Sequence, residues 1–182
     1  MEGTDKVTSS VRKLHIGGII KVDGWEIFNA IDLPDADHQG LAQDLSRFED
    51  NTFIEVYSSH VVEHFGYNSE LIPTLMEWKR VLKPGGYLYV SVPDLDILSR
   101  MVIDKKKYTI QQRFHIMRMI FGGQMDEFDF HKVGLNEEFL TWFLQKAGYR
   151  NIRRVQRFGI FNDTSELIYE GIQISLNIIA QK

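Results

Sequence analysis

The segment 78–94, WKRVLKPGGYLYVSVPD, constrains the fold more than any other part of the chain. Apolar residues at helical spacing lead up to Lys-Pro-Gly-Gly at 83–86, and an alternating strand follows over 87–92. Proline cannot continue a helix, and the two glycines can adopt the positive φ of an abrupt reversal. Helix, turn and strand in this order are half of a crossover unit, so the segment predicts a parallel α/β sheet.

A second apolar strand is expected over 53–57, and it runs into Ser58-Ser59-His60. Open α/β sheets bind ligands at the carboxyl ends of their strands. Small and polar residues at this point therefore indicate a ligand site at the sheet edge.

The remaining periodicities predict further elements. Strands are expected over 13–17, 25–31, 41–45, 151–158 and 173–180, and helices over 69–82, 95–102, 110–121 and 136–147. Only residues 18–24 join the first two strands, whereas a crossover through a helix needs roughly ten residues or more. That joint is therefore a compact loop or a hairpin. Asn68 or Ser69 is expected to cap the helix over 69–82.

Composition excludes several classes of protein. A chain of 182 residues, 43% of them hydrophobic, is expected to form a single domain over 1–182 with a helical insert at about 95–135. The net charge of −4 gives no reason to expect nucleic acid or an anionic membrane as a partner. With no cysteine there are no disulfides and no thiolate metal sites. The sequence shows no signal peptide and no membrane-spanning run, so a cytoplasmic protein is expected.

With these elements placed, the chain resembles the class I S-adenosylmethionine-dependent methyltransferases, in particular small predicted methyltransferases of bacteria. The resemblance rests on LHIGG at 14–18, Asp32, QDLSRFED at 43–50, YSSHVVEHF at 57–65, the segment 77–94, MRMIFGGQ at 117–124 and FNDTS at 161–165. It implies a Rossmann-like sheet, mostly parallel, with a C-terminal antiparallel hairpin. The first crossover helix of that fold is reduced or missing here.

The resemblance also implies a binding site for S-adenosylmethionine. Residues that match the family's cofactor contacts are Gly17, Gly18, Asp32, Asp44, Leu45, Ser59, His60 and Val61. In the family, a glycine turn lets the backbone approach the cofactor, and an acidic residue after the second strand accepts both ribose hydroxyls. The implied function is methyl transfer to a small molecule or a glycan precursor.

The glycine turn departs from the family pattern, which reads acidic-x-Gly-x-Gly-x-Gly. Here His15 takes the acidic place, and Ile19 and Ile20 follow Gly18. This departure favours an alternative reading, in which the chain is a non-catalytic binding or assembly module on a degenerate methyltransferase fold.

Candidate residues for the chemistry follow the fourth expected strand and the glycine pair at 122–123. His64 is a candidate general base because imidazole titrates near neutral pH, and Glu63 is the second candidate. Asp126, His131 and Lys132 lie on a polar segment suited to binding the substrate.

His60 to His64 also fits the H-x-x-E-H pattern of a zinc hydrolase. That chemistry needs both histidines on one helical face and a third ligand elsewhere. Gly66 stops any helix after about a turn, so no metal is expected.

The missing crossover helix predicts exposed apolar surface around Ile19, Ile20 and Trp25. Monomers rarely leave a large apolar patch in water. The N-terminus, the segment 95–121 or a second chain is expected to cover it, and a homodimer is favoured.

Overall fold

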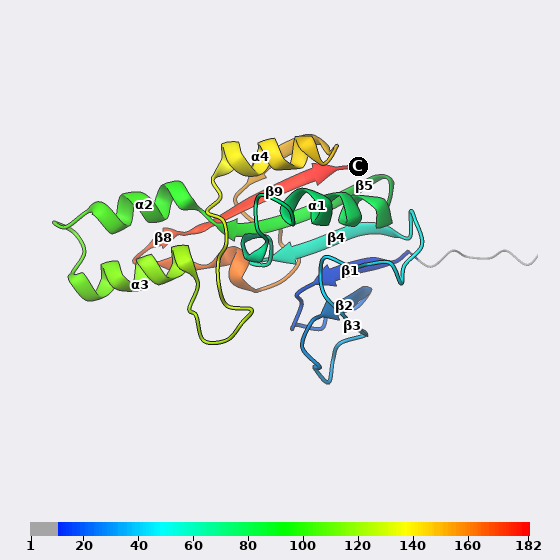
Figure 1. Cartoon of the computed structure of the whole chain (residues 1–182), viewed down its shortest axis with the longest axis horizontal. Coiled ribbons are helices and arrows are strands. Elements are labelled where there is room, and N and C mark those ends of the chain that lie inside the picture. Colours follow the sequence, from blue (N-terminus) through cyan, green and yellow to red (C-terminus); the bar gives the residue numbers. More distant parts are fainter. Residues whose placement is uncertain (1–10) are drawn as a thin grey trace, which may run out of the picture.

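A computed structural model describes residues 11–182, and its centre is a seven-stranded sheet in the order β3-β2-β1-β4-β5-β9-β6 (Figure 1). The strands are β1 (Lys13–Ile16), β2 (Trp25–Asn29), β3 (His38–Gln39), β4 (Phe53–Ser59), β5 (Leu82–Pro93), β6 (Arg150–Val155) and β9 (Ser175–Gln181). β9 runs antiparallel to both β5 and β6, and the other pairs are parallel. The predicted sheet, mostly parallel with an antiparallel C-terminal part, is confirmed.

Four helices accompany the sheet in the described residues. α1 (Leu71–Val81) and α4 (Glu137–Lys146) cover one face, while α2 (Leu95–Ile103) and α3 (Ile110–Phe121) pair with each other beyond the end of the sheet (Figure 1). Between β6 and β9 lie the short turn η2 (Thr164–Glu166) and the hairpin of β7 (Ile168–Tyr169) and β8 (Ile172–Gln173). No helix among residues 11–182 has the length and apolar character needed to span a bilayer.

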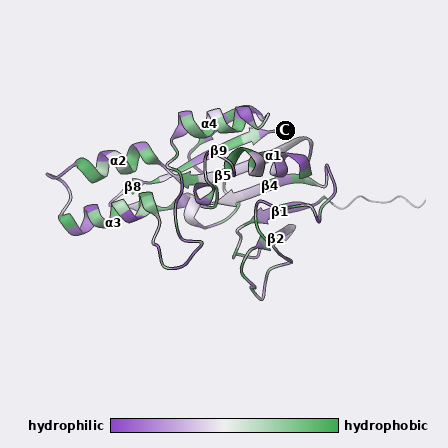
Figure 2. Ribbon diagram, viewed as in Figure 1, coloured by the Kyte–Doolittle hydropathy of each residue, from purple (hydrophilic) through white to green (hydrophobic). Residues whose placement is uncertain are grey.

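The main core lies between the sheet and the pair α1 and α4. Val56 of β4 and Leu88, Val90 and Val92 of β5 belong to this core and are fully buried. Trp78 of α1 is also fully buried, and its indole N–H donates to the carbonyl oxygen of Ala42 at 2.7 Å. Along the helices, hydrophobic and hydrophilic residues alternate as expected for helices with one buried face (Figure 2).

The opposite face of the sheet carries aromatic side chains and is covered by a loop. Tyr57 packs there against Trp25, and Phe158 and Phe161, from the segment after β6, close over both. Trp25 is only 6% exposed as a result. The exposed patch predicted around Trp25 is therefore wrong, because a C-terminal loop supplies the cover. Ile19 alone of the three predicted residues stays open, at 70% exposure.

The joint between β1 and β2 is a compact loop and not a hairpin, since the two strands pair in parallel. No helix forms over 17–24. The prediction that the first crossover helix is reduced or missing is confirmed.

Three local predictions are wrong. The third strand is β3 at His38–Gln39 and not 41–45, because Leu45 is drawn into the core. β5 begins at Leu82, which pairs with Phe53, so the Lys-Pro-Gly-Gly turn lies inside an irregular strand. Helix α1 is preceded by Glu70, whose carboxylate accepts from the N–H of Gly66 at 2.6 Å, and no Asn68 or Ser69 side chain caps it.

Candidate functional site

A cleft of about 380 Å³ lies at the carboxyl ends of β1, β2 and β4. This is the edge at which open α/β sheets bind ligands. Its lining comes from the sheet end, from the loop after β3 and from the loop before α4: Gly17, Phe28, Asn29, Ala30, Ile31, Gly40, Leu41, Ala42, Gln43, His60, Val61, His64, Phe65, Glu127, Phe128, Phe130 and Lys132.

Gly17 forms the sharp turn that leaves β1. Its φ is +75°, and its N–H donates to the carbonyl oxygen of Phe28 at 2.8 Å. A Cβ at this position would overlap the Cγ2 methyl of Val61. Only glycine therefore lets the backbone lie this close to the floor of the cleft.

Asn29 closes β2 at the cleft. Its side chain is 9% exposed, donates to the carbonyl oxygen of Gly18 at 3.0 Å and accepts from the N–H of Ile31 at 3.0 Å. An amide therefore stands at the end of the second strand, where the family places a carboxylate. Asp32 lies three residues further on and is exposed.

The structure brings together only part of the predicted cofactor set. Gly17, His60 and Val61 line the cleft. Asp32, Asp44 and Leu45 do not: Asp44 is exposed and binds the N–H of Ser46, and Leu45 is fully buried in the core. Neither Gly18 nor Ser59 is part of the lining.

The reasons for these last two placements are local. Gly18 packs under the ring of His15, which lies 2.6 Å from the place of a Cβ. Ser59 points to the opposite face of the sheet, where its hydroxyl contacts the hydroxyl of Thr164 at 2.8 Å.

The wall of the cleft at 41–43 and the aromatic wall made by Phe128 and Phe130 were not predicted from the sequence. The two phenylalanines are 51% and 45% exposed. Two phenylalanines in an otherwise polar segment after a glycine pair are the signal that could have indicated this wall.

His60 sits at the floor of the cleft in a strained conformation. Its φ is +55°, a region that costs a non-glycine residue roughly 1–3 kcal/mol and that clusters at functional sites. Its backbone N–H donates to the carbonyl oxygen of Ser91 at 2.9 Å, and its Nε2 lies 3.0 Å from the hydroxyl of Ser175. Burial lowers the pKa of His60 to about 3, so the imidazole is neutral at pH 7.

His64 lies in the short turn η1 (Val62–His64) and lines the cleft. Its Nδ1–H donates to the carbonyl oxygen of Phe130 at 3.1 Å. This bond leaves the lone pair on Nε2, and burial lowers the pKa of the ring. The predicted base is therefore neutral at pH 7 and able to accept a proton.

Glu63 is 1% exposed and does not reach the cleft. Neither carboxylate oxygen has a hydrogen-bond partner among the described residues. Burial raises the pKa of Glu63 to about 8. Its backbone carbonyl oxygen accepts from the N–H of Lys132 at 2.8 Å, which ties the loop before α4 to η1.

The three predicted substrate residues separate. His131 turns inward, with its Nε2 3.9 Å from an oxygen of Glu63. Asp126 is exposed and binds the N–H of Phe128 at 2.8 Å within its own loop. Lys132 lines the cleft and pairs with Glu70 at 3.0 Å.

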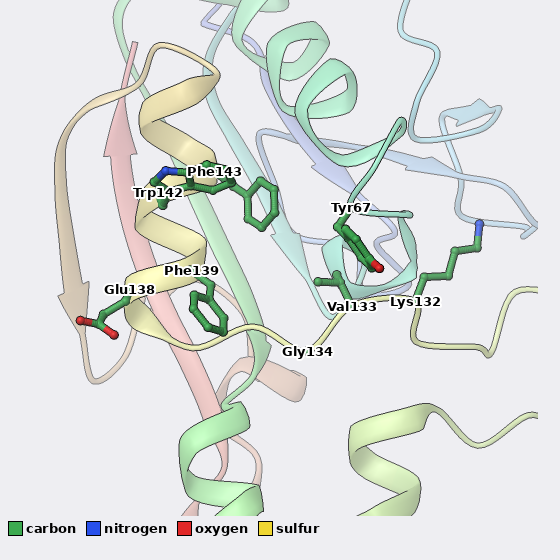
Figure 3. A pocket seen from close by; sticks show the side chains of 8 residues that line it. All are labelled: Tyr67, Lys132, Val133, Gly134, Glu138, Phe139, Trp142 and Phe143. Atoms are coloured by element: carbon green, nitrogen blue, oxygen red, sulfur yellow. The ribbon is translucent and has the colours of Figure 1, made fainter.

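A second, larger cavity of about 710 Å³ adjoins the cleft and shares Lys132 with it. Figure 3 shows it between α4 and the segment before α1, with aromatic rings from both sides. We call it the aromatic groove; its lining is Tyr67, Lys132, Val133, Gly134, Glu138, Phe139, Trp142 and Phe143.

Comparison with known proteins shows what this chain is similar to. Residues 3–90 match the family described as "Methyltransferase domain". A search of curated proteins found no match.

Solved structures similar to the chain include methyltransferases of several sources. A SAM-dependent methyltransferase from Methanosarcina mazei has a TM-score of 0.57 and 18% identity, covering 97% of this chain and 94% of its own. One from Archaeoglobus fulgidus has a TM-score of 0.58 and 16% identity, covering 96% and 87%. The CurJ carbon methyltransferase has a TM-score of 0.57 and 17% identity; the match covers 94% of this chain but only 48% of that protein.

The neighbours from Methanosarcina mazei and Archaeoglobus fulgidus are SAM-dependent methyltransferases by name. The cleft lies at the edge where open α/β sheets bind ligands. Residues 3–90 therefore match the methyltransferase domain family, and the chain has the fold of the class I S-adenosylmethionine-dependent methyltransferases.

Proposed function

We propose that the protein transfers a methyl group from S-adenosylmethionine bound in the cleft to an acceptor that enters over Lys132. The observation that carries this proposal is the convergence of Gly17, Asn29, His60 and Val61 at the carboxyl ends of three strands, around one cavity. At about 380 Å³, the cavity falls within the range of small-molecule sites.

The residues present suit the cofactor in shape. The close approach of Gly17 to Val61 leaves backbone exposed at the floor, and Leu41, Ala42 and Gln43 form a wall for a flat ring. Asn29 offers a polar side chain at the end of β2, although both of its functional groups already bind backbone atoms. We propose that the ribose lies near Asn29 and not near Asp32, because only Asn29 lines the cleft.

Bound S-adenosylmethionine supplies an electrophilic methyl group on its sulfonium, so proximity and alignment supply much of the catalysis. Phe128 and Phe130 line the cleft, where their rings would help to keep water from the bound cofactor. The free Nε2 of His64 is placed to take a proton from an acceptor hydroxyl.

The acceptor class we favour is a small molecule or a glycan precursor. Ring-shaped ligands pack on aromatic side chains with a few polar groups for orientation. The aromatic groove offers Phe139 and Trp142, which are 49% and 51% exposed, and Lys132 and Glu138 as polar groups. Because Lys132 borders both cavities, one acceptor molecule reaches from the groove to the cleft.

The competing function, a non-catalytic binding or assembly module, gains support from Asn29. A carboxylate accepts two ribose hydroxyls at once, whereas Oδ1 of Asn29 already accepts from Ile31. The two functions can be distinguished by cofactor binding: the enzyme must hold S-adenosylmethionine in the cleft, and the non-catalytic module need not.

Titration calorimetry and thermal shift with S-adenosylmethionine and S-adenosylhomocysteine test the proposal. A ligand at about 100 times its Kd stabilises by roughly 2.7 kcal/mol, which raises Tm by about 5–10 °C for a chain of this length. Asn29→Ala is expected to weaken binding at least tenfold, and Asp32→Ala to leave it unchanged. Absence of binding by both ligands would favour the module.

We also propose a cytoplasmic homodimer formed through α3. Ile110, Phe114 and Phe121 lie at helical spacing and are 71%, 60% and 52% exposed. The buried residue of α3 is Ile116, and these three side chains are exposed. An apolar stripe left open on a projecting helix is a candidate surface for a second copy.

A further inference from the structure

Behind the floor of the cleft, three side chains with metal-binding atoms meet around the buried carboxylate of Glu63. A nitrogen of His64, a nitrogen of His131 and an oxygen of Glu63 all lie within 4.8 Å of one another. The two imidazole rings stand edge to face, with centroids 4.8 Å apart. His60 approaches the same carboxylate, with its Nδ1 3.6 Å from Oε1.

The carboxylate is the unusual member of the cluster. Both of its oxygens are buried without a hydrogen-bond partner in the described part of the chain. A buried carboxylate without a partner costs several kcal/mol and is rare unless it is paired or coordinates a metal. Among residues 11–182 no lysine or arginine pairs with Glu63; the ionisable partners within 4 Å are His60 and His131.

Both histidines are already turned as metal ligands. His64 donates from Nδ1 to the carbonyl oxygen of Phe130 at 3.1 Å, and His131 donates from Nδ1 to the carbonyl oxygen of Ile120 at 3.3 Å. Each bond fixes the tautomer that leaves a lone pair on Nε2. Metal-ligating histidines almost always donate their other ring N–H in this way.

We propose that Glu63, His64 and His131 bind a divalent transition-metal ion of the zinc type. Two imidazoles and one carboxylate are the protein ligands of many open zinc and non-haem iron sites, whereas Mg²⁺ prefers oxygen ligands. Bonds of about 2.0–2.1 Å in tetrahedral geometry place ligand atoms roughly 3.3 Å apart. The three ligand atoms now lie within 4.8 Å of one another, so bringing them to this spacing needs side-chain movements of about 1 Å.

The site differs from the zinc-hydrolase pattern considered for His60 to His64. That pattern uses both histidines of one helix, and here His60 is engaged by the hydroxyl of Ser175 at 3.0 Å. The third ligand, His131, comes from the loop before α4, a long way off in sequence. The expectation that no metal binds rested on the absence of a long helix, and a site built from two segments does not need one.

The ion would lie between η1 and the loop before α4, two segments that backbone hydrogen bonds already join. The N–H groups of Lys132 and Val133 both donate to the carbonyl oxygen of Glu63, at 2.8 and 3.3 Å. His64 also lines the cleft, so an ion held by its Nε2 would lie beside the cleft and would replace the free imidazole as the group that acts on the acceptor. Such an ion would orient an acceptor oxygen and lower its pKa.

The test is titration of metal-free, untagged protein with Zn²⁺ and with Co²⁺, read by calorimetry, by elemental analysis after gel filtration and by the visible absorption of bound Co²⁺. The wild type is expected to hold one equivalent. Glu63→Gln and His131→Ala are expected to lose at least about 100-fold in affinity, since even outer-sphere partners contribute 10–100-fold. His115→Ala is the matched control, because His115 is exposed on α3 and contacts Tyr169 instead.

These readouts do not depend on methyl transfer, so the metal site and the proposed function can fail separately. The inference is overturned by well under one equivalent of either ion on the wild type, or by unchanged affinity in His131→Ala. If Glu63→Gln does not fold, His64→Ala replaces it, with the same expected loss.

Discussion

Gly17 is the position at which the packing of the cleft can be tested most directly, by Gly17→Ala. Alanine at a φ of +75° costs about 1–2 kcal/mol. Its Cβ would also overlap the Cγ2 of Val61, and forcing extra volume into a packed site costs roughly 1–3 kcal/mol more. The sum is about 2–5 kcal/mol. At roughly 2–4 °C per kcal/mol, Tm should fall by about 4–20 °C.

Gly24→Ala is the matched control. Gly24 has a φ of +82°, but no heavy atom lies within 4 Å of the place of its Cβ. The Gly24→Ala variant should lose only the free energy that the positive φ costs an alanine, about 1–2 kcal/mol. It should also keep the cofactor affinity of the wild type, because it is not part of the cleft, whereas Gly17→Ala should weaken binding.

The assay is chemical denaturation with calorimetric titration of S-adenosylhomocysteine. Adding Val61→Ala to Gly17→Ala removes the overlapping methyl, so the double variant should recover stability in a double-mutant cycle. Equal losses in Gly17→Ala and Gly24→Ala would refute the argument that close packing against Val61 makes glycine necessary.

Three further predictions concern other parts of the chain. Burial lowers the pKa of His15 to about 4, so below about pH 6.5 the unfolded chain takes up a proton that the folded protein does not. His15 should therefore lower the free energy of unfolding by up to about 3 kcal/mol between pH 7 and pH 4, and His15→Phe should reduce that fall in denaturation experiments at several pH values. Arg80 donates to the carbonyl oxygens of Leu45 and Phe48 and to Glu77, so Arg80→Met should cost about 2–4 kcal/mol in urea denaturation, and a cost below about 1 kcal/mol would contradict this. Light scattering should give a dimer of 21.2 kDa chains that Phe114→Ser converts to monomer, and a wild-type monomer would exclude the dimer.

Strand alternation made the sheet predictable. Residues 53–57 and 87–92 alternate between an apolar and a mixed face, and both lie in the observed β4 and β5. The third strand was expected over 41–45 but lies at His38–Gln39, because Leu45 is buried in the core without belonging to a strand of the sheet. The periodicity over 110–121 predicted α3 correctly, but the sequence carries no signal that Ile110, Phe114 and Phe121 are exposed, because packing partners far away in sequence decide which face is buried.

The position of the site at the sheet edge was predictable from the sequence, but only some of its lining residues were. His60 and Val61 follow directly from the end of β4, which the sequence marks clearly. Asp32 is acidic and close to β2, which made it the expected cofactor residue. The strand ends at Asn29, however, and Asp32, three residues further along the chain, does not line the cleft. The inward turn of His131 depends on a loop that returns to η1, and local sequence carries no signal for it.

The position of β9 determines the order in which the sheet can form. β6 hydrogen-bonds only to β9 among the described strands, although β9 follows it in the chain after the β7–β8 hairpin. Until β9 arrives, both β5 and β6 present unpaired edges, which are sites of aggregation. Folding of this half of the sheet therefore waits for a long-range pairing, and such topologies fold slowly. Refolding yield should be limited by the docking of β9, whatever occupies the cleft.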